Sequence, residues 1–410
     1  MRILRQRPQG SARPPVEATL ASDAGPARSL YLHVPFCFHK CHYCDFYSIV
    51  DTRDRQDAFT DRLIRELAAL APLARDEPLR TLFVGGGTPT LLRPDLWQRL
   101  IAALRDRFAI DGRTEWTVEC NPETVTDETA AVLASGGVTR ASVGAQTFNT
   151  RHLETLERWH EPDSVERAVG RLRDAGINRT SIDLIYAIPG QTAGDLAADL
   201  DRAVALGTEH VSAYTLTYEP GTAMTARLAK GEFEPAPEAL EIEMFELVGD
   251  RLAAAGLERY EISNFARPGA ECRHNLAYWR QEPWIAAGPS ASAHIGGHRW
   301  KNSPRLDDYL ENDDDGFAPI IDLEPPDPAR ALAERIMTGL RLREGLDADI
   351  TLREAESIRP AAPDRLRAVI SEQAALGRIE PASLAGGPWR LTRSGLLFAD
   401  GIAAELMAAL

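Results

Sequence analysis

The sequence predicts an α/β protein in which a partial (β/α)6 TIM-like barrel is followed by a small helical domain. Three observations support this fold class. Six short apolar segments alternate with helical patterns between residues 30 and 216. Polar residues follow several of these segments at the point where a strand is expected to end. The pattern then changes, and residues 329–410 have the pattern of consecutive helices with a short hairpin.

The barrel strands are predicted from apolar runs and the helices from apolar residues spaced three and four apart. In the first helix Leu63, Leu67 and Leu70 share one face. Strands are expected at 30–34, 79–84, 116–120, 140–144, 180–186 and 211–216. Helices are expected at 57–73, 94–108, 127–135, 164–175, 194–206 and 237–255. Such an alternation forms a parallel sheet, and a barrel brings the C-terminal ends of its strands to one mouth.

Composition divides the chain into four parts. Residues 1–27 are rich in Arg, Pro and Ala, and their prolines break an amphipathic helix, so we expect a disordered tail rather than a transit peptide. The barrel is expected at 28–260, and a connecting segment at 261–328 ends in an acidic, proline-rich linker that begins at Asp313. Residues 329–410 are expected to form a winged-helix-like domain, with helices at 329–342 and 364–376, short strands at 378–380 and 389–392, and a final helix.

Bulk properties exclude several classes of protein. The 410 residues carry a formal net charge of -15, which argues against the basic surface of a nucleic-acid-binding protein, the winged-helix pattern notwithstanding. No run approaches the roughly 18 apolar residues of a membrane helix, and the N-terminus lacks the apolar core of a secretory signal. Five cysteines, three of them clustered, do not resemble a secreted disulfide framework. We therefore expect a cytoplasmic protein with no nucleic-acid partner.

The most informative stretch follows the first predicted strand, where Cys37, Cys41 and Cys44 have the spacing Cys-x3-Cys-x2-Cys. Three thiolates can hold a [4Fe-4S] cluster and leave one iron without a protein ligand. Two other interpretations are open. Cys41 and Cys44 alone could form a redox pair, or the three thiols could bind zinc together with a nearby histidine. Structural zinc sites usually bring a second ligand pair at some distance, and the sequence shows none, so the cluster is favoured.

Polar motifs at the ends of later strands are expected to meet this cysteine loop. Gly85-Gly86-Gly87-Thr88-Pro89-Thr90 follows the second strand, and glycines let a ligand approach backbone groups closely. Glu119, Gln146 and Asp183 end three further strands, so the barrel places them at the same mouth. Each could alone be a helix cap or part of a surface ion pair. Their joint placement favours a ligand site.

Four motifs carry a family resemblance: His-Val-Pro-Phe-Cys-x3-Cys-x2-Cys-Asp-Phe, Gly-Gly-Gly-Thr-Pro-Thr, Ser-Val-Gly-Ala-Gln-Thr-Phe and Ser-Ile-Asp-Leu-Ile-Tyr-x2-Pro-Gly-Gln-Thr. Together they resemble the oxygen-independent coproporphyrinogen III oxidase-like branch of the radical SAM superfamily, and most of all its HemW-type haem chaperones. The resemblance implies a radical SAM core barrel, a [4Fe-4S] cluster and S-adenosylmethionine (SAM). It also implies that SAM is contacted by Tyr31, Gly86, Glu119 and Arg158, with a second group close to SAM formed by Tyr43, Gly87, Thr88, Gln146 and Asp183.

A further motif, His274-Asn275-x2-Tyr278-Trp279, is chemically suited to hold a flat macrocycle by axial ligation and stacking. HemW-type proteins carry this motif, so the resemblance implies that His274 contributes to haem binding. The residues taken alone favour a structural role. In that interpretation Tyr278 and Trp279 pack in the core and His274 makes a hydrogen bond.

Phe46 distinguishes two functions within this branch. The porphyrinogen-decarboxylating enzymes resemble one another in a further cysteine at the position of Phe46 and in a longer segment before the motif. The sequence therefore favours a haem chaperone that binds a cluster, SAM and haem. Its partners would be haem-accepting respiratory proteins at the inner face of a membrane, with peripheral membrane contact. An oxygen-independent coproporphyrinogen III dehydrogenase is the second hypothesis, and a zinc-binding interaction protein is a remote third.

Overall fold

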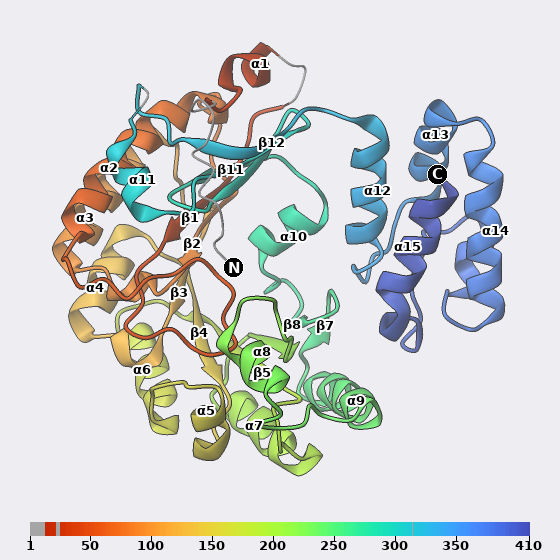
Figure 1. Cartoon of the computed structure of the whole chain (residues 1–410), viewed down its shortest axis with the longest axis horizontal. Coiled ribbons are helices and arrows are strands. Elements are labelled where there is room, and N and C mark those ends of the chain that lie inside the picture. Colours follow the sequence, from red (N-terminus) through yellow and green to blue (C-terminus); the bar gives the residue numbers. More distant parts are fainter. Residues whose placement is uncertain (1–12, 22–24, 314) are drawn as a thin grey trace.

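A 12-stranded sheet forms the centre of the protein, which we describe from a computed structural model for residues 13–21, 25–313 and 315–410 (Figure 1). Its six central strands run parallel and in chain order. They are β1 (Ser29–Val34), β2 (Thr81–Gly86), β3 (Glu115–Cys120), β4 (Arg140–Gln146), β5 (Arg179–Tyr186) and β6 (His210–Thr215). Because β1 and β6 each pair with a different strand at the outer edge, the barrel is open. The predicted partial (β/α)6 barrel is confirmed.

Helices cover the outside of this sheet, as the sequence predicts (Figure 1). They are α2 (Gln56–Leu70), α3 (Pro94–Arg107), α4 (Asp127–Gly136), α6 (Pro162–Asp174), α7 (Ala193–Ala205) and α9 (Glu238–Ala254). Two short helices were not predicted, α5 (Thr150–Thr155) and α8 (Ala223–Ala229), and α8 lies at the barrel mouth, where Met224 N donates to His42 O. The start of α7 shows why its boundary is sharp: Thr192 and Asp195 form a reciprocal capping box. The face of α2 that carries Leu63 and Leu67 is fully buried against the sheet.

Side-chain alternation along β4 decides what lines the barrel. Successive residues of a strand point to opposite faces, so Arg140, Ser142 and Gly144 share the inner face. In the sheet register Arg140 lies opposite Thr117 of β3, and Ser142 lies opposite Glu119. The inner face is therefore polar from the start of β4 to its end, which is unusual for a barrel core and indicates a ligand site.

The segment 261–328 was expected to connect the barrel to the C-terminal domain, but it contributes several strands to the sheet. Its strand β9 (Trp284–Ala287) lies parallel to β1, and β12 (Ile320–Glu324) pairs with β11 (His298–Asn302) inside the predicted linker. The linker prediction is wrong at β12, because the acids and prolines on either side indicate a linker although Ile320 is buried. Asp314 lies outside the described residues. The other elements are β7 (Glu258–Arg259), β8 (Asn264–Ala266), α10 (Arg273–Trp279), β10 (Ser292–Ile295) and α11 (Leu306–Glu311).

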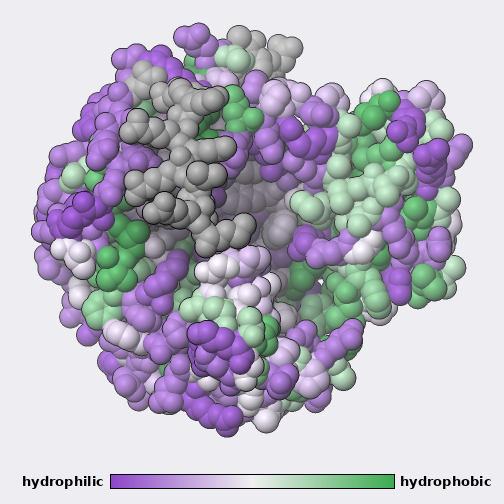
Figure 2. Space-filling view, in the orientation of Figure 1, coloured by the Kyte–Doolittle hydropathy of each residue, from purple (hydrophilic) through white to green (hydrophobic). Residues whose placement is uncertain are grey.

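The C-terminal helices form a body beside the barrel with a hydrophobic core of its own (Figure 1). They are α12 (Pro328–Gly339), α13 (Ala348–Ile358), α14 (Ala362–Ala375) and α15 (Ala399–Ala409). The expected hairpin is reduced to isolated antiparallel bridges such as Ile379 with Leu391. Arg280 joins this body to α10 through two 2.8 Å hydrogen bonds to Glu344. On the face seen in Figure 2, hydrophobic residues gather over these helices, whereas the barrel is mostly hydrophilic.

The start of the described chain differs from the expected disordered tail. Residues Val16–Ala21 form α1, which packs on the turn Ala71–Ala74 and buries Val16 and Thr19. The prediction of disorder is wrong for α1, because two side chains of this short helix are buried on the barrel. For residues 1–12 and 22–24 the prediction lies outside the described residues. Within the described ranges, no helix has the length and apolar character needed to cross a membrane.

Candidate functional site

The three clustered cysteines lie on the loop that joins β1 to α2. The loop is closed at its base by paired backbone bonds, from Cys37 N to Ile49 O and from Ile49 N to Pro35 O, both 2.8 Å. Its tip is tied to α8, because the backbone N–H of Met224 donates to His42 O (2.8 Å). The loop is therefore held at both ends although it contains no regular structure between Cys37 and Cys44.

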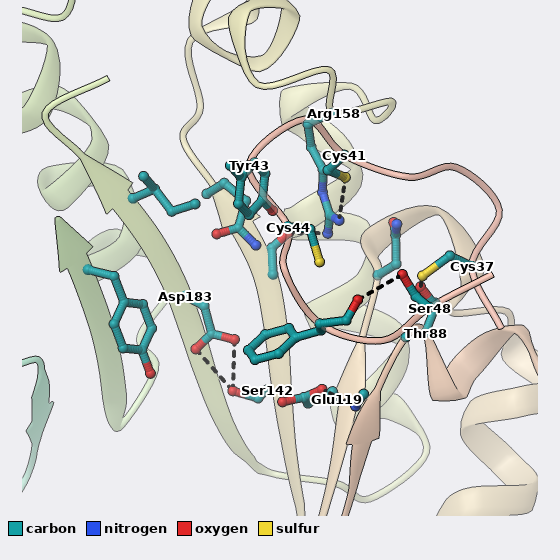
Figure 3. Close-up of a pocket in the computed structure, with 18 of the residues that line it drawn as sticks. Cys37, Cys41, Tyr43, Cys44, Ser48, Thr88, Glu119, Ser142, Arg158 and Asp183 are labelled. Carbon is teal, nitrogen blue, oxygen red and sulfur yellow. Dashed lines mark hydrogen bonds between the residues drawn. The ribbon is translucent and has the colours of Figure 1, made fainter. Parts of the chain in front are cut away.

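The three thiols line one cavity of about 430 Å³ at the barrel mouth (Figure 3). Cys37 Sγ is 3.6 Å from Thr88 Oγ1, and Arg158 Nη1 is 3.7 Å from Cys41 Sγ. Burial raises the pKa of Cys44 to about 11, although Lys40 opposes this shift. No three ligating side chains within the described ranges form a ready-made metal site. The loop would therefore have to adjust for all three sulfurs to share one cluster.

Histidines near the thiols have other partners, which weakens the zinc interpretation. His33 uses both ring nitrogens, with Nδ1 3.1 Å from Tyr31 Oη and Nε2 2.8 Å from Tyr47 O. His42 Nδ1 is 3.1 Å from Arg227 Nη1. His39 stacks on Trp159 with ring centroids 4.0 Å apart. His39 and Asp45 line the cavity from this loop as well, and His39 Nε2 has no hydrogen-bond partner among the described residues. The three thiols are nevertheless the part of this donor set that suits an iron-sulfur cluster with one open iron.

The glycine triplet closes against the cysteine loop so tightly that side chains are excluded. A Cβ at Gly87 would lie 2.6 Å from Phe36 O, and one at Gly86 would lie 2.6 Å from the His33 ring. Gly86 also has φ +109°, which a residue with a side chain rarely adopts. Backbone groups of Gly86 and Gly87 consequently face the cavity without shielding, next to Thr88. The predicted close approach of a ligand to these glycines remains a prediction.

Two carboxyl groups lie deeper in the cavity. Glu119 accepts a hydrogen bond from Gly86 N (3.0 Å), and burial, with Asp183 nearby, raises its pKa to about 7. Asp183 accepts from Ser142 Oγ at 3.0 Å, and burial raises the pKa of Asp183 as well (Figure 3). Both groups are acceptors for ligand hydroxyls or an ammonium when ionised. A cationic ligand would favour their ionised forms.

Arg158 links the cysteine loop to the end of β4. Its Nη2 donates to Gly144 O (2.8 Å) while its Nη1 faces Cys41, so the guanidinium lies beside the thiols (Figure 3). Gln146 adopts φ +65° at a register shift in β4, and it lines the cavity. Tyr43 lines the cavity from the cysteine loop. A carboxylate held near this guanidinium would be well placed next to a cluster.

The cavity thus brings together most of the predicted site residues. Those that line it are Cys37, Cys41, Tyr43, Cys44, Gly86, Gly87, Thr88, Glu119, Gln146, Arg158 and Asp183. Tyr31 and His274 do not belong to this lining. Tyr31 points into the barrel, where its ring stacks on Phe83 and its hydroxyl meets His33.

His274 lies on α10, buried behind the cavity. Its side chain is 2% exposed, and Nδ1 is 2.8 Å from Thr81 Oγ1. The ring packs on Phe83 and Tyr278, with centroids 5.1 and 4.7 Å away, and burial lowers its pKa to about 3. Within the described residues, Nε2 has no hydrogen-bond partner. This placement agrees with the structural role that the residues alone favour, yet it leaves a neutral imidazole with one free nitrogen.

Sequence reasoning missed several residues that line the cavity, among them Arg140, Ser142, Ser212 and Asn275. A signal for two of them was present. Arg140 and Ser142 precede Gly144 at two-residue spacing, so they had to share the inner face of the predicted strand. Asn275 was recognised only as a neighbour of His274, because nothing in the sequence shows that α10 reaches the barrel interior.

Comparison with known proteins agrees with this geometry. The model of the radical SAM superfamily matches residues 31–203. Among solved structures, coproporphyrinogen III oxidase (HemN) from Escherichia coli, described as a radical SAM enzyme, superposes with a TM-score of 0.81. That match has 22% sequence identity and covers 96% of this chain and 93% of the other. At this identity the match supports the fold.

Curated relatives are closer in sequence. The heme chaperone HemW of Mycobacterium tuberculosis (strain CDC 1551 / Oshkosh) is 38% identical over 337 residues, which cover 81% of this chain and 86% of that protein. The heme chaperone HemW of Escherichia coli (strain K12) is 35% identical over 271 residues, which cover 66% of this chain and 71% of that protein. The chain therefore belongs to the HemW family within the radical SAM superfamily.

Proposed function

We propose that this protein is a cytoplasmic haem chaperone that binds a [4Fe-4S] cluster, SAM and haem and transfers haem to respiratory proteins at the inner face of a membrane. One observation carries the proposal. Three thiols, a glycine edge and two buried carboxyl groups, supplied by the cysteine loop, β2, β3 and β5, line the same cavity. The haem part rests on the relatives that are called heme chaperones and share 35–38% of their residues with this chain.

In this proposal Cys37, Cys41 and Cys44 are the cluster ligands. A bound cluster supplies an open iron that the amine and carboxylate of SAM can chelate. Arg158 Nη1 lies 3.7 Å from Cys41 Sγ, so the guanidinium can pair with a ligand carboxylate beside this thiol. The loop closure at Cys37 and Ile49 keeps the thiols at the cavity wall.

SAM is proposed to lie along the glycine edge. Backbone groups at Gly86 and Gly87 receive its polar end, Thr88 and Gln146 flank it, and Tyr43 covers it from the cysteine loop. Glu119 and Asp183 accept hydrogen bonds from ribose hydroxyls. Tyr31 acts through His33, whose ring fills the space behind Gly86.

His274 is proposed as a haem ligand through its free Nε2. A neutral imidazole is the form that binds iron, and the bond from Nδ1 to Thr81 orients the ring. Because the ring packs between Phe83 and Tyr278, ligation requires α10 to move away from β2. This helix has seven residues, and the Glu115 carboxylate accepts from the backbone N–H of Arg273 at its start (2.8 Å), so the movement would break this hydrogen bond.

Titration of the reconstituted protein with haemin tests the proposal. We expect saturable binding with one haem for each chain. The shift of the Soret absorption measures this binding. The same protein, reduced and supplied with SAM and coproporphyrinogen III, should form no decarboxylated product. Product formation without haem binding would contradict the chaperone function and support the coproporphyrinogen III dehydrogenase activity.

The substitution His274→Ala is expected to weaken haem binding by about tenfold or more, because an axial ligand is lost while the cluster loop is unchanged. Haemin titration measures the effect, and iron content with absorbance near 400 nm shows that the cluster remains. His298→Ala serves as the matched control, since His298 lies on β11, outside both α10 and the cavity lining. Equal affinity and identical haem spectra for both variants would remove His274 from the haem site.

A further inference from the structure

We propose that Arg140, with Thr117 and Asn275, forms a subsite at the floor of the cavity that binds a carboxylate of the ligand. This inference rests on the proposed function, in which the ligand is haem and the carboxylates are its propionates. The subsite is separate from the thiols and adjoins Glu119 and Asp183, the deepest groups assigned to SAM.

Arg140 is a buried cation that makes no direct ion pair within the described residues, although the nearby charges of Glu115 and Asp183 favour its charged form. Its residue is 2% exposed, and its guanidinium lines the cavity from the first position of β4. Nε has no hydrogen-bond partner, and the described residues offer the side chain no ion pair. An unpaired buried guanidinium is costly, since charged groups lose their hydration on burial. An anion from a ligand would offset that cost.

The carboxylates nearest along the sheet are already engaged. Glu115 accepts from Arg179 Nη1 (3.1 Å) and from the backbone N–H of Arg273 (2.8 Å). The hydroxyl of Ser142 donates to Asp183, with Oγ 3.0 Å from each carboxylate oxygen, and Glu119 accepts from the backbone N–H of Gly86. These carboxyl groups therefore act on the charge of Arg140 through space, but their hydrogen bonds go to other donors, which leaves the N–H groups of Arg140 available to a ligand.

Two neutral donors complete the proposed subsite: Thr117, which neighbours Arg140 on the adjacent strand, and Asn275, which lines the same cavity as Arg140. Thr117 is the register partner of Arg140 on β3, and its buried hydroxyl has no hydrogen-bond partner in the described chain. Asn275 lines the cavity from α10, and within the described ranges its side chain makes no hydrogen bond. A guanidinium, a hydroxyl and an amide are together the donor set that recognises a carboxylate.

Depth separates this subsite from Arg158. Gly144, whose carbonyl accepts from Arg158, lies four positions after Arg140 on β4, and this separation corresponds to roughly 13 Å along a strand. The amine and carboxylate of one small amino acid cannot reach both levels. A carboxylate carried on an arm of a large flat ligand can reach the floor while the ring stays higher.

Binding of haemin and of its dimethyl ester by the cluster-loaded protein tests the inference. The ester keeps the ring and the iron but has no free carboxylate. We expect wild-type protein to bind haemin about tenfold to a hundredfold more tightly than the ester, the range for a charge-assisted hydrogen-bonded pair. Arg140→Gln should bind haemin as weakly as the ester, and Arg140→Lys should recover part of the difference. Arg113→Gln, an exposed arginine, is the control and should behave as wild type.

Thermal unfolding shows whether Arg140→Gln is folded; if it is not, the two ligands on wild-type protein decide alone. Equal affinity for haemin and ester would overturn the carboxylate subsite and leave the chaperone proposal intact. Failure of both ligands to bind would contradict the proposed haem function itself, and the subsite with it.

Discussion

Cys41→Ser is expected to abolish the cluster, because Cys41 is one of three thiols on the loop and is the one that faces Arg158. Serine is a poor ligand for iron, and two thiolates do not hold a cubane. After anaerobic reconstitution we expect less than about a tenth of the wild-type iron, and no broad absorption near 400 nm. The fold should persist, since Cys41 is only half-buried and lies outside the hydrophobic core.

Cys272→Ala is the matched control for this experiment. Cys272 is fully buried before α10 and does not line the cavity, so its removal should leave iron content and absorbance unchanged. A variant at Cys41 that retains a full complement of iron would show that this thiol is not a ligand. Zinc instead of iron in the purified protein would favour the zinc-binding alternative.

Gly87→Ala is expected to distort the cavity, because the new side chain would displace the backbone at the base of the cysteine loop. The new methyl group would lie 2.6 Å from Phe36 O and 2.9 Å from Pro35 C, and these backbone atoms form the base of the cysteine loop. Because neither atom can turn aside as a side chain could, the loop must shift. We expect the free energy of unfolding to fall by about 2 kcal/mol and SAM affinity to fall at least about tenfold. Urea unfolding and equilibrium binding of SAM measure the two effects.

Gly112→Ala provides the comparison for a glycine in open space. A Cβ at Gly112 meets no atom within 4 Å, so stability and SAM binding should match the wild type. If Gly87→Ala also bound SAM normally, the glycine edge would not be the SAM site.

The barrel and most of the cavity could be predicted because their signals are local. Apolar runs recur with each predicted strand, and polar residues such as Glu119 and Asp183 follow them at the strand ends. The parallel topology of the barrel then brings these polar residues together. Strand β12 could not be predicted, because Ile320 is stabilised by pairing with β11 and not by its own neighbours. The environment of His274 depends on where α10 packs, and only long-range contacts with Thr81 and Phe83 decide this.

Arg140 illustrates a different limit. Its position on the inner face of β4 followed from alternation, but its lack of a partner depends on Glu115 and Asp183 being engaged elsewhere. A count of charges in the sequence cannot show such engagement. The most informative residue of the cavity floor is therefore recognised from the hydrogen bonds of its neighbours.

Transfer of haem to an acceptor is the measurement that tests the central claim most directly. The cluster-loaded protein, charged with one haem and supplied with SAM, is mixed with the haem-free cytochrome subunit of a respiratory complex, and the Soret spectrum of the acceptor is followed. We predict that haem leaves the protein and reconstitutes the acceptor faster than free haemin does at the same concentration. Haem that stays on the protein, or reaches the acceptor no faster than free haemin, would contradict the chaperone function.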